Sequence, residues 1–158
     1  MGHNFWQPDM TYQVHQASVA DVDEVAPLFD AYRVFYKQPS DLPRAKRFLH
    51  DRLSSNESVV FFATDENGTA VGFVQLYPSF SSVTTERVWV LNDLYVAATA
   101  RRNGVAKLLM NRARDFVQER QDKGLTLETG ADNLSAQALY ESLGYVKETS
   151  IHYFLSCQ

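Results

Sequence analysis

The sequence contains one cysteine, Cys157, among its 158 residues. A single thiol rules out an intramolecular disulfide and fits a reducing compartment, and its place beside the C-terminus is typical of an incidental surface group. The four histidines are His3, His15, His50 and His152. Their positions relative to one another and to the cysteine do not match the spacing of metal ligands. We therefore expect no metal site.

Long apolar runs and an excess of basic charge are also missing. Runs such as Val59 to Ala63 are far shorter than the roughly 20 apolar residues that a membrane helix needs. The opening residues Met-Gly-His-Asn-Phe-Trp lack the basic and apolar stretches of a secretory signal. The net charge is −4, whereas a protein that binds nucleic acid usually carries an excess of basic residues. We expect a cytoplasmic protein that binds neither membrane nor nucleic acid.

Apolar and aromatic residues are plentiful enough for one folded core. They make up 45% and 13% of the chain, respectively. No repeat, low-complexity tract or change in composition marks a linker. The sequence therefore predicts a single domain over residues 1–158, with residues 1–10 as an irregular lead-in.

The spacing of apolar residues predicts an α/β fold. Three successive strand-like runs without a helix between them favour an antiparallel meander. The expected elements are a strand at Tyr12 and Val14, helices starting near Ser18 and at Ser40 or Asp41, strands 59–64, 70–77 and 86–96, a helix after Gly104 that Gly124 ends, strand 125–129, helix 135–143 and strand 151–155. This order, β-αα-βββ-α-β-α-β, predicts a mixed sheet of about six to seven strands flanked by about four helices.

Residues 101–106, Arg-Arg-Asn-Gly-Val-Ala, join the apolar run Leu91 to Val96 to an amphipathic helix. A strand, a tight turn with glycine and a helix N-terminus together aim backbone N–H groups and the positive end of the helix dipole at one point. Arg101 and Arg102 add positive charge beside it. The junction is suited to a ligand phosphate, although an ordinary turn with surface arginines would read the same way.

Two motifs resemble those of one family. Arg101-x-x-Gly104-x-Ala106 fits the pyrophosphate-loop pattern Arg/Gln-x-x-Gly-x-Gly/Ala of the GNAT superfamily of acetyl-CoA-dependent N-acetyltransferases. Further on, Asn133-x-x-Ala136-x-x-x-Tyr140 runs into Gly144-Tyr145, which is similar to a second signature of that family. The resemblance is strong over residues 88–146, and the element order predicted above is the order of the GNAT fold.

The resemblance implies where acetyl-CoA would bind. The pantetheine arm would pair with the backbone of one strand, and the pyrophosphate would lie over the glycine loop. Asn133 would hydrogen-bond the arm or a water, or cap its helix. The cofactor-binding residues implied are Leu94, Tyr95, Val96, Arg101, Arg102, Asn103, Gly104, Val105, Ala106, Lys107, Asn133, Ala136 and Tyr140.

The resemblance also implies catalytic roles. Tyr140 would protonate the departing thiolate, since a phenol with a pKa near ~10 can donate to a nearby sulfur. The base that takes the proton of the amine has three candidates: Asp93, Glu128 and an ordered water. Asp93 lies where the diamine acetyltransferases of the family carry a carboxylate, but Asn92 stands where that branch has an adjacent acid.

The acceptor pocket is predicted from aromatic residues near the end of the first helix. Tyr32, Tyr36 and Tyr77, with Asp93 at the base, would attract an alkylammonium by cation–π contact and charge pairing, although such aromatics also suit core packing. We expect transfer of acetyl to a small primary amine, with polyamines favoured. Acetylation of a protein lysine or N-terminus and a non-catalytic acyl-CoA sensor remain alternatives. The family and the apolar run Ile151 to Leu155 favour a homodimer.

Overall fold

A computed structural model describes residues 11–158, so the predicted lead-in over residues 1–10 lies outside the described residues. The chain forms two compact units, which divide after Glu128. The first holds the sheet and three helices, and the second holds one helix and the C-terminal segment. That the chain is a single domain stays a prediction.

The sheet runs in sequence order through five strands: β1 (Gln13–Gln16), β2 (Val59–Thr64), β3 (Ala70–Ser81), β4 (Glu86–Val96) and β5 (Gly124–Thr126). Strands β1 to β4 pair antiparallel, and β5 runs parallel to β4. The predicted α/β class, mixed sheet and meander are confirmed. The described residues contain five strands, which is fewer than the six to seven expected.

Local hydrogen bonds form the turn between β2 and β3. A carboxylate oxygen of Asp65 accepts the backbone N–H groups of Asn67 and Thr69, each at 2.9 Å. Gly68 follows with φ of +79°, a left-handed conformation that suits glycine. This local bonding fixes the register with which the two central strands enter the sheet.

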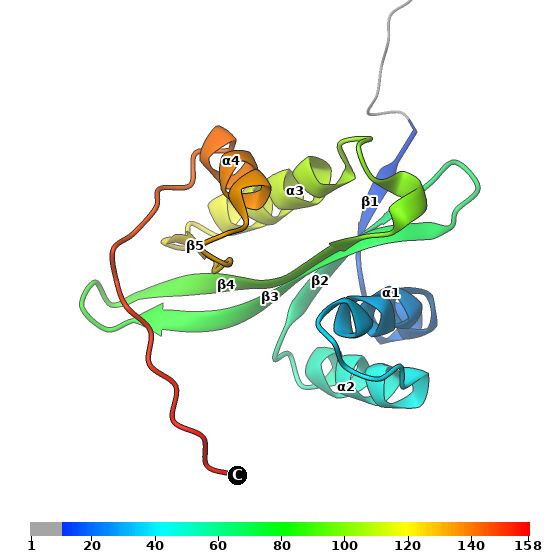
Figure 1. Cartoon of the computed structure of the whole chain (residues 1–158), viewed down its shortest axis with the longest axis horizontal. Helices are drawn as coiled ribbons and strands as arrows, with labels where there is room; N and C mark the ends of the chain where they lie inside the picture. The colour runs from blue at the N-terminus through cyan, green and yellow to red at the C-terminus, as the bar shows by residue number, and fades with distance from the viewer. Residues whose placement is uncertain (1–10) are drawn as a thin grey trace, which may run out of the picture. The chain divides into compact units, whose positions relative to one another are not determined.

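Helices α1 (Val22–Phe35) and α2 (Leu42–Ser54) cover one face of the sheet, and α3 (Val105–Glu119) covers the other (Figure 1). Of the two predicted caps of α2, the structure uses Asp41, whose carboxylate accepts the N–H of Arg44 at 3.1 Å. Ser40 instead donates its hydroxyl to Asp30 at 2.6 Å, a bond that lowers the pKa of that carboxyl. Asp30 therefore anchors the connection between the two helices.

Aromatic packing joins α1 to the sheet. Phe73 of β3 is fully buried and meets the rings of Phe29 and Tyr32 edge-on, at centroid distances of 6.1 and 5.9 Å. Edge-to-face rings add favourable electrostatics to the burial of their apolar area. The end of α1 that carries Tyr32 is thus fixed against the middle of the sheet.

On the opposite face, α3 approaches β3 closely at Gly72. A Cβ atom placed there would lie 3.2 Å from Val105 and 3.1 Å from the carbonyl oxygen of Tyr95. The missing side chain therefore lets the start of α3 lie directly on the sheet. Helix α3 ends at Glu119, and the prediction that Gly124 ends it was wrong, because Gly124 begins β5.

The connection after α3 is held by one long-range and one local hydrogen bond, and the expectation that a glycine ends the helix could not anticipate the long-range one. Asp122 accepts the indole N–H of Trp89 at 2.8 Å and the Nε–H of Arg120 at 2.9 Å. The indole bond is the main cause of the lowered pKa of Asp122. The chain therefore turns back to β4 before it reaches the glycine.

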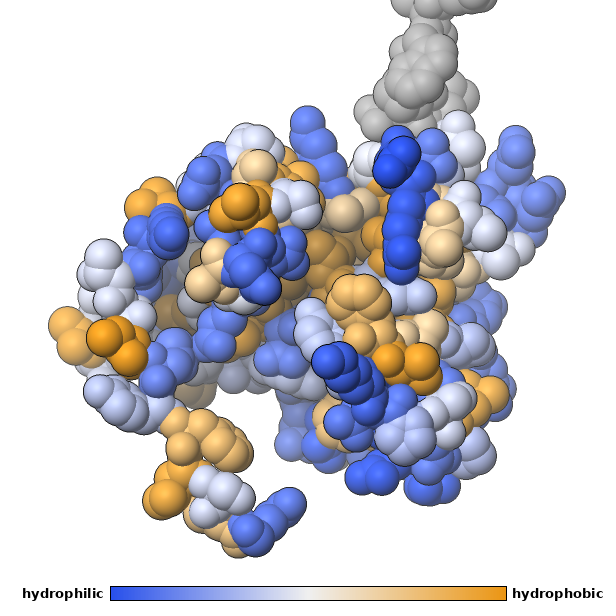
Figure 2. Space-filling model, viewed as in Figure 1, coloured by the Kyte–Doolittle hydropathy of each residue, from blue (hydrophilic) through white to orange (hydrophobic). Residues whose placement is uncertain are grey.

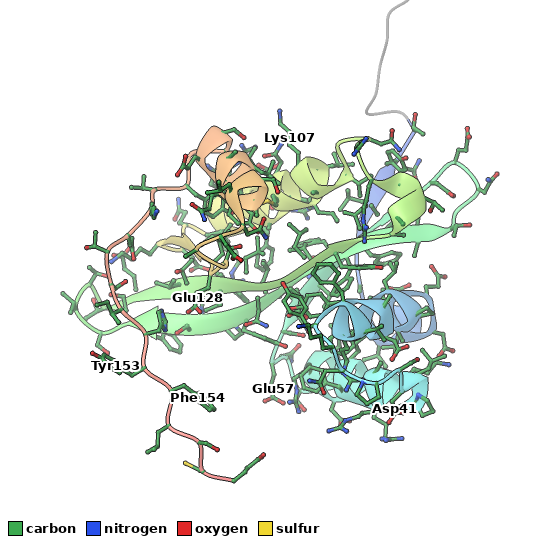
Figure 3. The ribbon with its side chains drawn as sticks, in the orientation of Figure 1. Asp41, Glu57, Lys107, Glu128, Tyr153 and Phe154 are labelled. Atoms are coloured by element: carbon green, nitrogen blue, oxygen red, sulfur yellow. The ribbon has the colours of Figure 1, made fainter. Side chains whose placement is uncertain are left out.

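The second unit consists of α4 (Leu134–Ser142) and an extended segment. The predicted strand Ile151 to Leu155 was wrong, since residues 143–158 form neither helix nor strand. Its apolar side chains are exposed, and Figures 2 and 3 show them along the segment that includes Tyr153 and Phe154. A strand needs a partner for its backbone groups, and apolar spacing carries no information about that partner.

Candidate active site

A bulge in β4 positions the acidic residue Asp93. Gln75 of β3 lies opposite Asp93, but the next residue, Leu76, lies opposite Leu91, so Asn92 is an extra residue in β4. Such a bulge bends a strand and re-aims its side chains. Asn92 is exposed, whereas Asp93 is only 2% exposed. The bulge thus turns a carboxylate into the layer between the sheet and α1.

Two side-chain amides hold the Asp93 carboxylate. Nε2 of Gln75 donates to Oδ2 at 2.5 Å, and Nδ2 of Asn92 donates to Oδ1 at 2.7 Å. Burial raises the pKa of Asp93, while the bonds from Asn92, Gln75 and Tyr32 oppose that rise. The result is a carboxylate that is fixed in place and more basic than an ordinary aspartate.

Two tyrosines lie beside this carboxylate, and a third packs against one of them. The pKa of Tyr32 is raised by burial and by the charges of Asp93, Tyr36 and Tyr77. The pKa of Tyr77 is raised by burial and by Asp93, against the opposing charge of Arg52. Tyr36 packs edge-on against Tyr32 at 4.9 Å and is 61% exposed. The structure therefore brings together the four residues predicted for the acceptor pocket, which we call the tyrosine–Asp93 cluster.

The hydroxyl of Tyr32 connects the buried carboxylate to the surface. Tyr32 is half-buried, and its hydroxyl lies 3.4 Å from the carbonyl oxygen of Asn92 and within reach of Asp93. Because both Asp93 oxygens already accept amide N–H groups, a bound group would meet Asp93 chiefly through this hydroxyl.

The far end of β4 has a strand on one side only in the described sheet. Its pairing with β5 covers Val88 to Val90 alone, whereas Leu94, Tyr95 and Val96 pair only with β3. These three residues are half-buried. The backbone groups of this stretch that face away from β3 could therefore pair with an extended ligand, as the predicted role of this segment requires, except the Val96 carbonyl, which accepts the Nε–H of Arg101.

The glycine loop carries two left-handed residues. Gly104 has φ of +78° and Arg102 has φ of +67°, and sequence reasoning missed the second because arginine gives no signal for it. Within residues 11–158, no hydrogen bond takes the backbone N–H groups of Val105, Ala106 or Lys107. They are the orphan donors of a helix start and suit an anion.

The basic residues of the loop differ in orientation. Arg101 turns back onto β4, where its Nε–H donates to the carbonyl of Val96 at 3.0 Å and its guanidinium lies over the Tyr95 ring. Arg102 and Asn103 are exposed, and Lys107 points away from the sheet (Figure 3). Arg101 therefore braces the loop, and the exposed cations beside it remain available to a ligand.

The remaining predicted residues lie at or beyond the division between the units. Glu128 is exposed, two residues after β5. In the second unit Asn133 caps α4 by accepting the N–H of Ala136 at 3.3 Å, and the ring of Tyr140 on α4 lies 6.1 Å from that of Tyr145. The capping role foreseen for Asn133 is present. The catalytic and cofactor roles of these residues stay predictions.

Gln75 is the residue of this site that sequence reasoning missed. A weak signal existed, because it is the one polar side chain within the apolar run from Val71 to Leu76. The alternation of inward and outward side chains along a strand could not show that Gln75 faces Asp93, because the bulge shifts the register between β3 and β4.

Within residues 11–158, the side chains offer no metal cluster and the helices no membrane span. No three His, Cys, Asp or Glu side chains in this range lie where they could hold a metal ion. None of the helices described is long and apolar enough to cross a membrane.

Known proteins resemble the chain over most of its length. The model of the acetyltransferase (GNAT) family matches residues 23–145. The uncharacterized N-acetyltransferase YhfO of Bacillus subtilis (strain 168) is 45% identical over 144 residues, which cover 90% of this chain and 96% of the relative. The crystal structure of a probable acetyltransferase is 40% identical and superposes with a TM-score of 0.87, covering 92% of this chain and 98% of the other.

A more distant structure shares the fold alone. It is an aminoglycoside N-acetyltransferase in complex with CoA, 17% identical, with a TM-score of 0.77 and coverage of 93% of this chain and 95% of the other.

Proposed function

Since the chain belongs to the acetyltransferase (GNAT) family, we propose that it transfers the acetyl group of acetyl-CoA to the primary amine of a small molecule, with a polyamine as the favoured acceptor. The proposal of an amine acceptor rests on the tyrosine–Asp93 cluster. A buried carboxylate attracts an ammonium group, and the tyrosine faces favour an alkylammonium through cation–π contact. Neither feature would favour an anionic or a purely apolar acceptor.

The residues of the first unit fit acetyl-CoA at two points. The outward backbone of Leu94 to Val96 suits the pantetheine arm, and the N–H groups at the start of α3, with Arg102 and Lys107 beside them, suit the pyrophosphate. When bound, acetyl-CoA supplies the thioester carbonyl that the amine attacks. The coenzyme-bound relative of similar fold supports this choice of cosubstrate.

The acceptor must lose a proton to become a nucleophile. A free alkylammonium has a pKa near ~10.4, several units above that of a carboxyl group. Burial raises the pKa of Asp93, which narrows this gap, and desolvation beside the tyrosine rings lowers the pKa of the ammonium. We assign the base role to Asp93 and propose that the Tyr32 hydroxyl passes it the proton, since Tyr32 is only half-buried and its hydroxyl reaches the buried Asp93.

Other parts of the reaction are assigned to groups outside the cluster. We propose that a backbone N–H near Leu94 stabilises the oxyanion, that Tyr140 protonates the departing thiolate, and that Asn133 contacts the coenzyme arm. Glu128 is the alternative base, because it too is a carboxylate at the end of a neighbouring strand.

We also propose that the protein is cytoplasmic and forms a homodimer. Exposed apolar side chains at Ile151, Tyr153, Phe154 and Leu155 support an interface, because such a run is unfavourable in water. Light scattering at several concentrations measures the mass directly. A monomer at all of them would contradict the dimer and leave the acetyltransferase proposal in place.

The acceptor assignment is tested by measuring CoA release from acetyl-CoA with polyamines, amino acids, aminoglycosides and lysine peptides, and by mass spectrometry of the product. We expect the highest kcat/KM with a polyamine. Preference for a lysine peptide would overturn the small-amine assignment. Tight binding of acetyl-CoA with no release from any amine would indicate a non-catalytic sensor, and failure to bind acetyl-CoA would contradict the proposal as a whole.

A further inference from the structure

Gln75 is a completely buried amide in the centre of the sheet. Its neighbours in β3, Val74 and Leu76, are equally buried and apolar. Burial of an amide costs free energy unless its polar atoms are hydrogen-bonded, so a glutamine here is unfavourable for packing alone. What the side chain contacts therefore indicates why an amide occupies this position.

The amide has one polar contact in the described structure, and it is with Asp93. Its Nε2 donates to Oδ2 of that carboxylate, while its Oε1 is buried without a hydrogen-bond partner in residues 11–158. The two residues face one another across β3 and β4 at the bulge. The carboxylate is thus held by an amide whose second polar atom is unused.

We propose that Gln75 is a positioning residue that keeps Asp93 in place in both of its protonation states, an inference that rests on the base role given to Asp93. When Asp93 is ionised, Nε2 of Gln75 donates to it. When Asp93 has taken a proton, a half-turn of the amide presents Oε1 to accept the new O–H. An amide offers both a donor and an acceptor at nearly the same place, and no apolar side chain offers either.

The surroundings of Asp93 limit what else could do this. Tyr32 faces it from α1, Tyr77 from β3, and Asn92 from β4. From α2, the charge of Arg52 reaches Tyr77. Asn92 is exposed and can exchange its bond for water, whereas Gln75 is completely buried and cannot.

The test compares wild type with Gln75→Met, which keeps the length of the side chain and removes the amide. The pKa of Asp93 is read from its carboxyl carbon by NMR in protein labelled at aspartate, with Asp93→Asn assigning the signal. Gln118→Met, an exposed change on α3, is the control. We expect the pKa of Asp93 to rise by about one unit in Gln75→Met alone, because the charge-assisted bond to ionised Asp93 is stronger than the neutral bond that Oε1 accepts from the protonated form, and both are lost.

The same variant should move the acidic limb of kcat/KM to higher pH by the same amount and leave the KM for acetyl-CoA unchanged. An unaltered pKa of Asp93 in folded Gln75→Met would overturn the inference. If Gln75→Met does not fold, the side-chain amide signals of Gln75 in wild type provide the test. They should titrate with the pKa of Asp93, and signals constant with pH would refute the coupling.

The NMR measurement does not depend on catalysis, so the two proposals can fail separately. A raised pKa of Asp93 in Gln75→Met, together with full activity of Asp93→Asn, would refute the base role of Asp93 and still support the coupling between the two side chains. An unaltered pKa of Asp93 in Gln75→Met, together with an inactive Asp93→Asn, would support Asp93 as the base and refute the positioning role of Gln75.

Discussion

The hydroxyl of Tyr32 lies 3.4 Å from the carbonyl oxygen of Asn92, the extra residue of the β4 bulge. The two residues are 60 positions apart in the sequence, on a helix and a strand that pack face to face. The bulge that turns Asp93 inward is therefore in contact with the end of α1. This contact therefore fixes the position of the proposed base, Asp93, relative to Tyr32, which belongs to the predicted acceptor pocket.

Replacement of Tyr32 by Phe should lower kcat about tenfold to a hundredfold, because the ring stays and the hydroxyl that passes the proton is lost. The free energy of unfolding should fall by only about 1 kcal/mol, as for one hydrogen bond. Steady-state kinetics and urea unfolding measure the two effects. Tyr153→Phe, at a 93% exposed site, is the control. Full activity of Tyr32→Phe would exclude the relay.

Replacement of Gly104 by Val should weaken acetyl-CoA binding at least tenfold, because a branched side chain at φ of +78° strains the loop and obstructs the approach of phosphate to the backbone. Gly68→Val is a matched control, since Gly68 has φ of +79° in a turn between strands and also has open space around its missing Cβ. Both variants should lose about 1–2 kcal/mol of stability. Calorimetry showing equal losses of affinity, or none, would refute the loop assignment.

Replacement of Gly72 by Ala should destabilise the first unit by about 1–3 kcal/mol, because the new methyl group would press against Val105 and Leu109 at the start of α3. The same displacement should weaken acetyl-CoA binding, since Val105 begins the helix below the loop. Gly124→Ala, where a Cβ meets no atom within 4 Å, is the control. Unchanged thermal stability in Gly72→Ala would show that α3 adjusts freely.

Replacement of Tyr140 by Phe should lower kcat and leave the Kd for acetyl-CoA within about twofold of wild type, because only a proton donor is removed. The ring contact with Tyr145 should survive in the variant. Stopped-flow measurement of thiolate release, together with calorimetry, separates the two quantities. Unchanged turnover would remove Tyr140 as the acid.

Local chemistry could be predicted from sequence, and long-range register could not. The Asp65 turn, the Asp41 cap and the left-handed Gly104 each follow from residues within a few positions. The Asn92 bulge depends on how β3 and β4 align, so the pairing of Gln75 with Asp93 was invisible until the strands were placed.

Two failures have the same origin. Gly124 does not end α3 because Asp122 bonds to Trp89, which lies 33 residues away in β4. Ile151 to Leu155 is rich in apolar and aromatic residues, as a strand often is, yet strand formation depends on a partner that the sequence does not identify. Of the candidate site, the residue types were predictable, while the burial of Asp93 and the amide that holds it required the structure.

The dependence of kcat/KM on pH, measured for wild type and Asp93→Asn with the preferred amine, tests the central claim most directly. Burial raises the pKa of Asp93, so the wild-type acidic limb should lie above the pH at which an ordinary aspartate titrates, and activity should rise as Asp93 loses its proton. Asp93→Asn should lose this limb and about 10²- to 10⁴-fold of kcat/KM, with acetyl-CoA still bound. A variant that keeps both the limb and the rate would contradict the assignment of Asp93 as the base.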